Sequence, residues 1–329
     1  MTRVLIAGGY GVVGGWIARH LRAAGHDIDL VLGGRTPESG AALAAELKAG
    51  VVALDSDDAA DGLARAGAFD LVICALQDPD DNLLNAALRA GSAYVGVVRK
   101  LDNLGPTAMA CSILAQRPAL LLGHWQAGVT TFAALAAASA LRRVDQIAIA
   151  ALFDPTDRAG PMATRDSGAF FTRALMRRDG AWDRVAQADN IREIERGDLP
   201  AFMAQPMGVL DVAGLQVMTG ARDVRFDIGL GQSIGAAAGG DASHDIYIDL
   251  AGEDPQGRLV RQRMLVSDPH GQAHLTALGV LVGAERLLGL DGAPPPAAGL
   301  VFPERAIDPH RATARLRAFG VRVQTEAVA

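Results

Sequence analysis

The sequence predicts an α/β fold with a doubly wound parallel sheet, followed by a second domain of the α+β class. The chain has 329 residues, 50% of them hydrophobic, which is enough for two domains with substantial cores. Residues 1–125 alternate short apolar runs with alanine-rich helical stretches, a pattern typical of a parallel sheet covered by helices on both faces. After Trp125 this alternation stops, which indicates a change of architecture.

Strands and helices alternate throughout the first part of the chain. The strands are expected at residues 3–7, 28–33, 51–54, 71–75, 93–97 and 120–123. The helices between them are expected at residues 12–24, 38–48, 59–66, 82–90 and 106–116. This βα repetition predicts the doubly wound sheet.

Strands no longer follow helices in the second part. Helices are expected at residues 129–142 and 273–288. Strands are expected at residues 144–153, 208–210, 224–228, 245–250 and 259–267, the last two forming a hairpin. Two stretches, residues 229–243 and the proline-containing residues 292–299, have the composition of linkers or mobile loops.

Charge and cysteine content narrow the class of partner. The chain has 31 basic and 37 acidic side chains and a net charge of −6, which disfavours nucleic acid as a partner. Cys74 and Cys111 are far apart, which argues against a disulfide scaffold or a cysteine-bound zinc and fits the cytoplasm. The longest apolar segment, residues 129–141, is too short for a bilayer, and no signal peptide is expected, so no membrane partner is predicted.

A GxGxxG segment follows the first strand and begins the first helix, which is the context that a Rossmann dinucleotide site requires. Gly9 would allow a tight turn, Gly11 would let a pyrophosphate approach the backbone, and Gly14 would let helix and strand pack closely. The alternative is a glycine-rich turn that binds nothing. The residues expected to contact the cofactor are Gly9, Tyr10, Gly11, Val12, Val13 and Gly14.

The end of the second strand predicts which nicotinamide cofactor binds, since a carboxylate there holds a ribose 2'-hydroxyl and a cation accepts a 2'-phosphate. Asp29 lies at the start of that strand, about 10 Å from its carboxyl end at roughly 3.3 Å per residue. The end itself is Gly34, Arg35 and Thr36, without a carboxylate. Arg35 can form a fork on a phosphate, which favours NADP over NAD, the alternative being that Arg35 is solvated.

Two further strand ends supply candidate cofactor contacts. Asp55, after the third strand, could accept a hydrogen bond from the adenine amine or could cap the following helix. Ala75, Leu76 and Gln77 end the fourth strand and are expected to lie along the cofactor's ribose, mainly through their backbone.

Several segments, taken in their order along the chain, resemble those of the saccharopine dehydrogenase-like oxidoreductases. The first half contains GGYGVVGG, LVLGGR, Asp55 after the third strand and ALRAGSAYVGV. The second half contains GHWQAGVTTFAALAA, YIDLAGEDPQGR, the alanine- and leucine-rich helix after His274 and AGLVFPERAI. Such proteins often carry an aspartate two residues after the tyrosine of the fifth strand, whereas Tyr94 is followed by Gly96 at that position.

The resemblance implies an NADP- or NAD-dependent oxidoreductase that acts at a carbon–nitrogen bond, an imine or secondary amine, or at a carbonyl centre of an amino-acid-like substrate. The resemblance also implies that the chain is divided into three parts. These are a dinucleotide-binding Rossmann domain over residues 1–126, an α+β substrate and dimerisation domain over 127–291, and a C-terminal segment over 292–329 that returns to the first domain. A homodimer acting on a small molecule is expected.

Loops beyond the carboxyl ends of the strands are where reacting groups gather in an open α/β sheet. His124 follows the sixth strand and can exchange a proton near neutral pH, although a structural histidine is the alternative. Lys100 follows the fifth strand, and a partly buried lysine can reach a catalytic pKa, the alternative being a surface lysine. Arg99 and Gln126 are candidate substrate contacts beside them.

His270 and His274 have the i,i+4 spacing that can place two imidazoles on one face of a helix. The HExxH glutamate is absent, so no metal is expected, and both histidines are candidates to line the substrate cleft.

The sequence leaves two other hypotheses open. The missing fifth-strand aspartate favours a catalytically inactive dinucleotide sensor or chaperone-like protein. A transferase or epimerase that uses bound NADP without net turnover is the third possibility.

Overall fold

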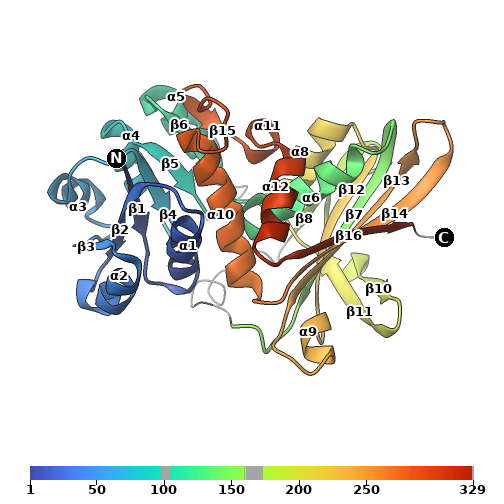
Figure 1. Cartoon of the computed structure of the whole chain (residues 1–329). Coiled ribbons are helices and arrows are strands. Elements are labelled where there is room, and N and C mark those ends of the chain that lie inside the picture. The colour runs from blue at the N-terminus through green and yellow to red at the C-terminus, as the bar shows by residue number, and fades with distance from the viewer. Residues whose placement is uncertain (98–103, 159, 161–172, 328–329) are drawn as a thin grey trace. The chain divides into compact units, whose positions relative to one another are not determined.

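The computed structural model describes residues 1–97, 104–158, 160 and 173–327 of the chain. The chain divides into two compact units (Figure 1). The first comprises residues 1–123 and 276–307, and the second comprises residues 124–275 and 308–329.

A seven-stranded parallel sheet forms the centre of the first unit, with the order β15-β6-β5-β4-β1-β2-β3. Its strands are β1 (Thr2–Ala7), β2 (Ile28–Gly34), β3 (Gly50–Ala53), β4 (Leu71–Cys74), β5 (Ala93–Gly96), β6 (Pro118–Leu121) and β15 (Gly299–Val301). The strand order reverses between β1 and β4, which makes the carboxyl ends of these two strands the place where ligands of such sheets bind. The predicted doubly wound parallel sheet is confirmed.

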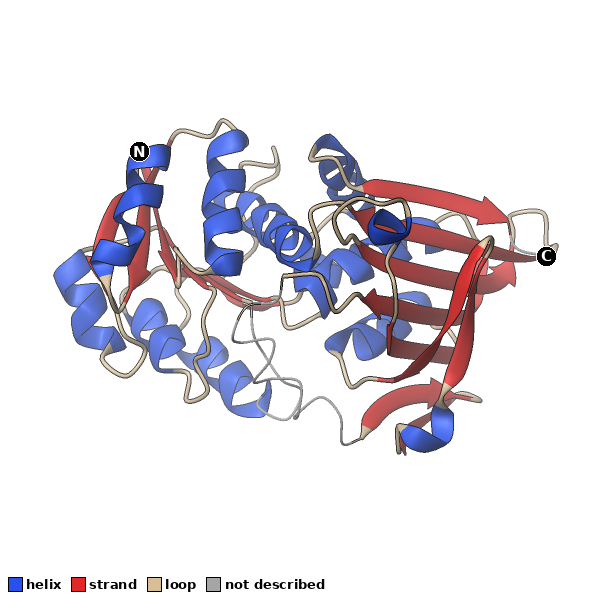
Figure 2. Cartoon of the chain, turned by 90° about the horizontal axis from the view of Figure 1, so that it is seen from below, coloured by secondary structure: helices blue, strands red, loops and turns tan. Residues whose placement is uncertain are grey.

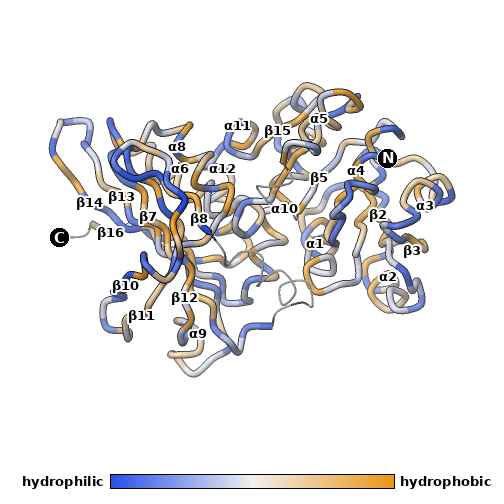
Figure 3. The backbone as a smooth tube through the Cα atoms, turned by 180° about the vertical axis from the view of Figure 1, so that it is seen from behind, coloured by the Kyte–Doolittle hydropathy of each residue, from blue (hydrophilic) through white to orange (hydrophobic). Residues whose placement is uncertain are grey.

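Helices cover both faces of this sheet. The helices of this unit are α1 (Val12–Ala23), η1 (Pro37–Gly40), α2 (Ala41–Leu47), α3 (Ala59–Ala66), α4 (Asn82–Arg89), α5 (Leu104–Leu114), α11 (Pro303–Ala306) and part of α10 (Gln272–Leu288). On one face, Leu84 and Cys111 belong to the same buried cluster as Val72 and Tyr94. On the other, Gly283 of α10 lies so close to the side chains of Leu120 and Leu122 that a Cβ there would be 2.8 Å from Leu120 Cδ2. Figure 3 shows the hydrophobic stretches in orange within both units.

A mixed sheet lies at the centre of the second unit, and Figure 2 shows its strands in red. Its order is β10-β11-β12-β7-β13-β14-β16, with β8 beside β12 and β9 beside β8. Its central strands are β7 (Arg143–Phe153), β12 (Asp223–Leu230), β13 (His244–Glu253) and β14 (Leu259–Asp268). The outer strands are β8 (Ala174–Arg178), β9 (Ala181–Val185), β10 (Arg192–Arg196), β11 (Leu199–Pro206) and β16 (Arg322–Ala327). Among the described strand pairs of this second sheet, only β7 and β12 are parallel, and β13 and β14 form the predicted hairpin.

Three longer helices of the second unit pack on this sheet and on one another, and short ones connect the strands. The longer helices are α6 (Val129–Ala138), α8 (Leu210–Thr219) and α12 (Pro309–Ala318). The short ones are η3 (Trp125–Gly128), η4 (Ala188–Asn190) and α9 (Ile234–Ala237). The side-chain amide of Gln262 in β14 donates to the Ala137 carbonyl oxygen at the end of α6 (2.9 Å). None of the helices in the described ranges is long and apolar enough to cross a membrane.

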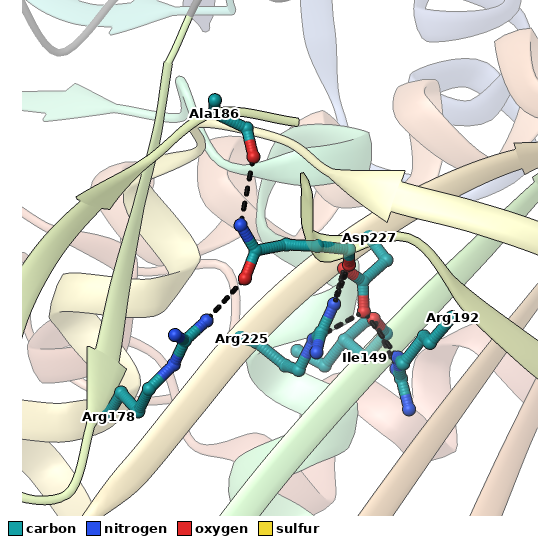
Figure 4. A network of polar contacts seen from close by, with 7 residues as sticks. Ile149, Arg178, Ala186, Arg192, Arg225 and Asp227 are labelled. Carbon is teal, nitrogen blue, oxygen red and sulfur yellow. Dashed lines mark hydrogen bonds and ion pairs between the residues drawn. The ribbon is translucent and has the colours of Figure 1, made fainter. Parts of the chain in front are cut away.

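A buried carboxylate fixes the strands at one side of this sheet (Figure 4). Asp227 in β12 is fully buried and accepts hydrogen bonds from Arg192 Nε (2.6 Å) and from the Arg225 guanidinium (2.6 and 2.8 Å). Arg225 also donates to the backbone carbonyl oxygen of Asn190 (2.9 Å), and Arg178 donates to its side-chain oxygen (2.5 Å). The cluster therefore joins β8, η4, β10 and β12 through hydrogen-bonded charges.

The structure corrects two predictions about the second part of the chain. The strand predicted at 208–210 is wrong, because Leu210 begins α8, whose buried Val212 and Leu215 follow a helical rather than an alternating period. The stretch 229–243 is not a simple linker. It contains the end of β12 and the helix α9, and Asp245 accepts hydrogen bonds from Ser243 Oγ (2.8 Å) and from the backbone of Ile234 (2.7 Å).

The two compact units differ from the predicted domain boundaries in the last third of the chain. Residues 276–291 belong to the first unit, since α10 packs on β6 through Gly283. Residues 308–329 belong to the second unit, because β16 pairs with β14. Only residues 292–307 of the predicted C-terminal segment belong to the first unit, where β15 pairs with β6.

Candidate functional site

The glycine segment forms a tight turn between β1 and α1. The backbone N–H groups of Gly8 and Gly9 both donate to the Gly33 carbonyl oxygen of β2 (2.8 and 3.1 Å). A Cβ at Gly14 would collide with the Gly8 carbonyl and lie 2.9 Å from the Gly9 Cα, so α1 can approach the turn this closely only with glycine there. Gly14 thus has the packing role that the fingerprint predicts.

Gly11 differs from Gly14 because its side-chain position is nearly open. Gly11 is the exposed N-cap of α1, and a Cβ there would meet only the Gly8 carbonyl oxygen, at 3.2 Å. No side chain caps the helix, its first turn has no acidic residue, and Val12 beside Gly11 is 43% exposed. An uncapped helix N-terminus next to open backbone fits a dinucleotide pyrophosphate.

The carboxyl end of β2 carries no carboxylate. Asp29, at the start of the strand, pairs with Arg3 Nε at 3.0 Å and is directly opposite Arg3 in the sheet. Arg35 and Thr36, which follow the strand, are exposed, and Arg35 forms no ion pair with any residue in the described ranges. A guanidinium without a carboxylate neighbour fits a 2'-phosphate.

Tyr10 lies against this same strand end. Its phenol oxygen accepts a hydrogen bond from the backbone N–H of Thr36 (3.0 Å). Its ring packs on the bare backbone of Gly34 and Gly40, since a Cβ at Gly40 would be 2.6 Å from Tyr10 Cδ1 and one at Gly34 would collide with the phenol. Tyr10, Gly34, Arg35 and Thr36 therefore form one contiguous surface.

The other predicted cofactor contacts lie at neighbouring strand ends. Asp55 Oδ1 accepts from the backbone of Asp57 (3.3 Å), while Asp58 is the N-cap of α3, so Asp55 does not cap the helix itself. Ala75 follows β4 and donates its N–H to the Ala7 carbonyl oxygen of β1 (2.9 Å). A Cβ at Gly8 would lie 2.9 Å from the Ala75 carbonyl oxygen and 3.4 Å from the Leu76 Cβ. The first two residues of the segment 75–77 therefore lie next to the glycine turn.

In the second unit, His124 lies next to a buried carboxylate. Asp211, in the first turn of α8, is fully buried and accepts hydrogen bonds from Trp125 N–H (2.7 Å) and Thr131 Oγ1 (2.8 Å). Burial raises the pKa of the Asp211 carboxyl, and attraction to the positive charge of His124 offsets part of this rise. His124 itself is 5% exposed. His124 and Asp211 therefore lie together among the buried polar groups of the second unit.

The turn after His124 has an unusual backbone. Gln126 and Ala127 have φ angles of 50° and 52°, and Gly128 has 93°, so three successive residues are left-handed. Two of them are not glycine, and such conformations cost of the order of 1–3 kcal/mol each. Gln126 Nε2 lies 2.9 Å from His244 Nε2, and Trp125 Nε1 donates to the same nitrogen at 3.2 Å.

His244 is therefore a neutral acceptor. It is fully buried, and burial lowers its pKa to about 3. Because its Nε2 accepts from Trp125, its proton is on Nδ1, which is buried and has no hydrogen-bond partner within the described part of the chain. The strained turn is held on one side by Asp211 and on the other by His244.

His270 and His274 lie close together, although not on one helix as their spacing suggests, because His270 is in the turn that precedes α10. Their rings lie 4.8 Å apart, and His274 Nδ1 is 2.7 Å from the buried Asp268 carboxylate. Asp157 lies at the same place, because it accepts from the backbone of Gln272 (2.8 Å) and a Cβ at Gly271 would collide with it. No group of metal-binding side chains occurs in the described ranges.

Two of the predicted site residues, Arg99 and Lys100, lie outside the described residues. The structure brings the remaining ones together in three groups: the strand ends of the first unit, the turn of His124 and Gln126, and the pair of His270 and His274. Sequence reasoning missed Asp211 and His244. They lie 86 and 119 positions from Trp125 in the sequence, and nothing in their local sequence marks them.

Known proteins share this fold but little of the sequence. No protein-family model and no curated protein matches the chain. The structure of apo saccharopine dehydrogenase (L-Glu forming) from Saccharomyces cerevisiae is similar over 100% of both chains, with a TM-score of 0.75 and 13% identity. Homospermidine synthase from Legionella pneumophila, solved in complex with NAD, is similar over 99% of this chain and 91% of its own, with a TM-score of 0.69 and 10% identity. At these identities the likeness concerns the fold alone. The chain therefore has the fold of saccharopine dehydrogenase, as the motif resemblance predicts.

Proposed function

We propose that the chain is an NADP-dependent oxidoreductase of the saccharopine dehydrogenase-like type. In this proposal it transfers a hydride at a carbon–nitrogen bond, an imine or secondary amine, or at a carbonyl centre of an amino-acid-like substrate. The observation that carries it is the open glycine turn next to a β2 end that has Arg35 and no carboxylate. The neighbours by fold support the reaction class, since one is a saccharopine dehydrogenase and the other was solved with NAD.

The residues present fit a dinucleotide. Gly11 and the start of α1 would hold the pyrophosphate, residues 75–77 would lie along the ribose, and Arg35 would bind the 2'-phosphate. When bound, the nicotinamide supplies or accepts the hydride. Asp55 is proposed as a contact of the adenine, with its second carboxylate oxygen, because its Oδ1 already accepts from Asp57.

His124 is proposed as the group that exchanges the proton. It is the first residue of the second unit and follows β6 by only three positions. The positive charge of His124 lies close enough to lower the pKa of the buried Asp211 carboxyl, and an imidazole can give a proton to an amine or an alkoxide. Gln126, Arg99, His270 and His274 are proposed substrate contacts, and Lys100 is the second candidate for proton exchange.

Arg35→Ala tests the cofactor assignment. A charge-assisted hydrogen bond of about 1.5–3 kcal/mol corresponds to a loss of about tenfold or more in NADPH affinity, with NADH affinity unchanged. Arg89→Ala, an exposed arginine on α4, is the matched control and should leave both affinities unchanged. Calorimetric titration measures both, and equal losses for the two cofactors after Arg35→Ala would contradict the assignment.

The reaction is tested by NADPH oxidation with amino acids paired with keto acids or aldehydes. Once a substrate is found, His124→Ala should lower kcat by about 10² to 10⁴ and leave NADPH affinity nearly unchanged. A fall below about fivefold assigns proton exchange elsewhere, and Lys100→Met becomes the next variant. Tight NADPH binding without turnover of any such pair would favour the inactive sensor instead.

Two further proposals concern the environment of the protein. We propose a cytoplasmic location, supported by Cys74 and Cys111, which are buried and are not joined in a disulfide. We also propose a homodimer, which light scattering of the purified chain tests directly.

A further inference from the structure

Tyr10 occupies the place where a side chain at the end of β2 would otherwise project. The three atoms nearest to a Cβ built at Gly34 all belong to Tyr10, and so do the three nearest to a Cβ built at Gly40. The ring is therefore packed between two glycines, and no larger residue fits at either position while the ring is there. In NAD-binding sheets of this type, the end of β2 is where the ribose-binding carboxylate stands.

The phenol also has a free donor. Its oxygen already accepts from the backbone N–H of Thr36 (3.0 Å), so its own proton points elsewhere. No acceptor for that proton occurs in the part of the chain that the structure describes. Accepting one hydrogen bond polarises a hydroxyl and strengthens the bond that it donates. Arg35 and Thr36 follow Gly34 directly in the sequence, and Thr36 is the N-cap of η1 although its side chain makes no capping hydrogen bond.

Resting on the proposed function, we infer that Tyr10 is the residue that determines cofactor choice. Its ring excludes a carboxylate from the end of β2, and its hydroxyl donates to the 2'-phosphate of NADP next to Arg35. The selectivity thus has two parts. One is steric and acts against the acidic residue that NAD requires, and the other is a hydrogen bond to the phosphate that only NADP carries.

Tyr10→Phe separates the hydrogen bond from the ring. The full-length chain is titrated with two adenosine fragments, 2',5'-ADP and 5'-AMP, which differ only in the 2'-phosphate. Tyr10→Phe should weaken 2',5'-ADP by about tenfold and change 5'-AMP by less than about twofold, because a hydrogen bond to a charged group is worth about this much. Tyr247→Phe, in β13 of the second unit, is the matched control and should change neither.

Gly34→Asp tests the steric part. Alone, this substitution should lower Tm and weaken both NADPH and NADH, because the carboxylate collides with the ring. Combined with Tyr10→Ala, it should restore Tm and bind NADH at least as tightly as NADPH. If Gly34→Asp alone binds NADH with an unchanged Tm, the ring does not exclude a carboxylate and the inference is overturned.

The fragments distinguish failure of this inference from failure of the proposed function. If wild type prefers NADPH but Tyr10→Phe weakens 2',5'-ADP and 5'-AMP equally, or neither of them, Tyr10 only shapes the loop and the inference alone fails. If wild type binds NADH as tightly as NADPH, the NADP assignment fails as well. The expected pattern, with loss confined to the 2'-phosphate fragment, supports both.

Discussion

The backbone N–H of Trp125 donates a 2.7 Å hydrogen bond to the carboxylate of Asp211, which lies on a different helix. The second carboxylate oxygen accepts from Thr131 Oγ1 in α6 (2.8 Å). Asp211 therefore joins the first turn of α8 to both sides of the turn at residues 125–128. That turn has two left-handed residues that are not glycine, so it needs such external bonds to persist.

Asp211→Asn should lower the free energy of unfolding by about 1–3 kcal/mol. The amide keeps the volume but has only one oxygen, so either Trp125 N–H or the Thr131 hydroxyl loses its acceptor while buried. Urea denaturation measures the loss.

Thr131→Val is the paired control, since it removes one of the two donors. If the bonds act together, the double variant should lose less than the sum of the single losses. Strict additivity would show that the Asp211 carboxylate does not couple the two helices.

Gly11 and Gly14 should respond to substitution in two different ways. Gly11→Val should abolish NADPH binding in a folded protein, because its side chain extends from an open position into the space of the pyrophosphate. Gly14→Ala should reduce stability itself, since its Cβ collides with the Gly8 carbonyl. Thermal unfolding with and without NADPH separates the two effects.

Gly15→Ala is the control for this series. A Cβ at Gly15 would meet only the flexible ends of the Arg19 and Leu43 side chains, at 3.4 and 3.6 Å, so binding should be unchanged and stability should not fall. Normal NADPH binding by Gly11→Val would show that the glycine turn does not hold the cofactor.

The first unit was predictable because its information is local. Strand, turn and helix follow one another within residues 2–23, and the GxGxxG spacing fixes the turn between them. The carboxyl end of β2 was predictable for the same reason, since Arg35 and Thr36 directly follow a β-branched and leucine-rich run. The position of the Tyr10 ring was not, because it depends on the absence of a Cβ at Gly34 and Gly40, 24 and 30 positions away.

The second unit depends on pairings that sequence periodicity does not contain. β12 and β7 lie side by side in parallel although about 80 positions separate Asp223 from Arg143, and β16 reaches the sheet only at the end of the chain. Likewise, only the folding of the chain brings Asp211 and His244 next to the segment of His124, Trp125 and Gln126. An aspartate in the first turn of a helix is ordinary, and only its burial distinguishes Asp211 from such aspartates.

Asp227→Asn should cost about 3 kcal/mol of unfolding free energy. Asp227 is fully buried and compensates Arg192 and Arg225, whose side chains are 25% and 20% exposed, so its loss leaves two largely buried guanidiniums without a counter-charge. Asp249→Asn is the matched control on the neighbouring part of the sheet. Asp249 pairs with Arg263 at 2.6 Å but is 32% exposed, and its loss should cost about 1 kcal/mol or less. Equal losses would show that burial of Asp227 adds nothing to its contribution.

Two aspartates three positions apart should give stability opposite dependences on pH. Burial raises the pKa of Asp157 to about 6, and the nearby charges of Asp154 and Asp268 add to the rise against the hydrogen bond from Gln272. Burial also acts on Asp154, but hydrogen bonds from the backbone of Ser233 and from Thr156 outweigh it and lower the pKa of Asp154 to about 2.

The sign of each effect follows from proton binding. Between pH 4 and 6 the folded chain keeps the Asp157 proton that the unfolded chain has released, so this group makes stability fall as pH rises. Asp154 is ionised more readily when folded, so its contribution is present above pH 4 and is lost as pH falls toward 2.

The Tm of Asp157→Asn should therefore rise relative to the Tm of wild type as pH increases from 4 to 7, because asparagine keeps an acceptor for Gln272 and carries no charge.

Asp154→Asn should be less stable than wild type at pH 6, and this difference in stability should narrow below pH 4. It should also lower the pKa of Asp157, which loses a repelling neighbour. Asp198→Asn, an exposed aspartate, is the control and should follow wild type throughout. Thermal unfolding at each pH measures all three, and a constant Tm difference between Asp157→Asn and wild type from pH 4 to 7 would mean that Asp157 titrates like an ordinary carboxyl.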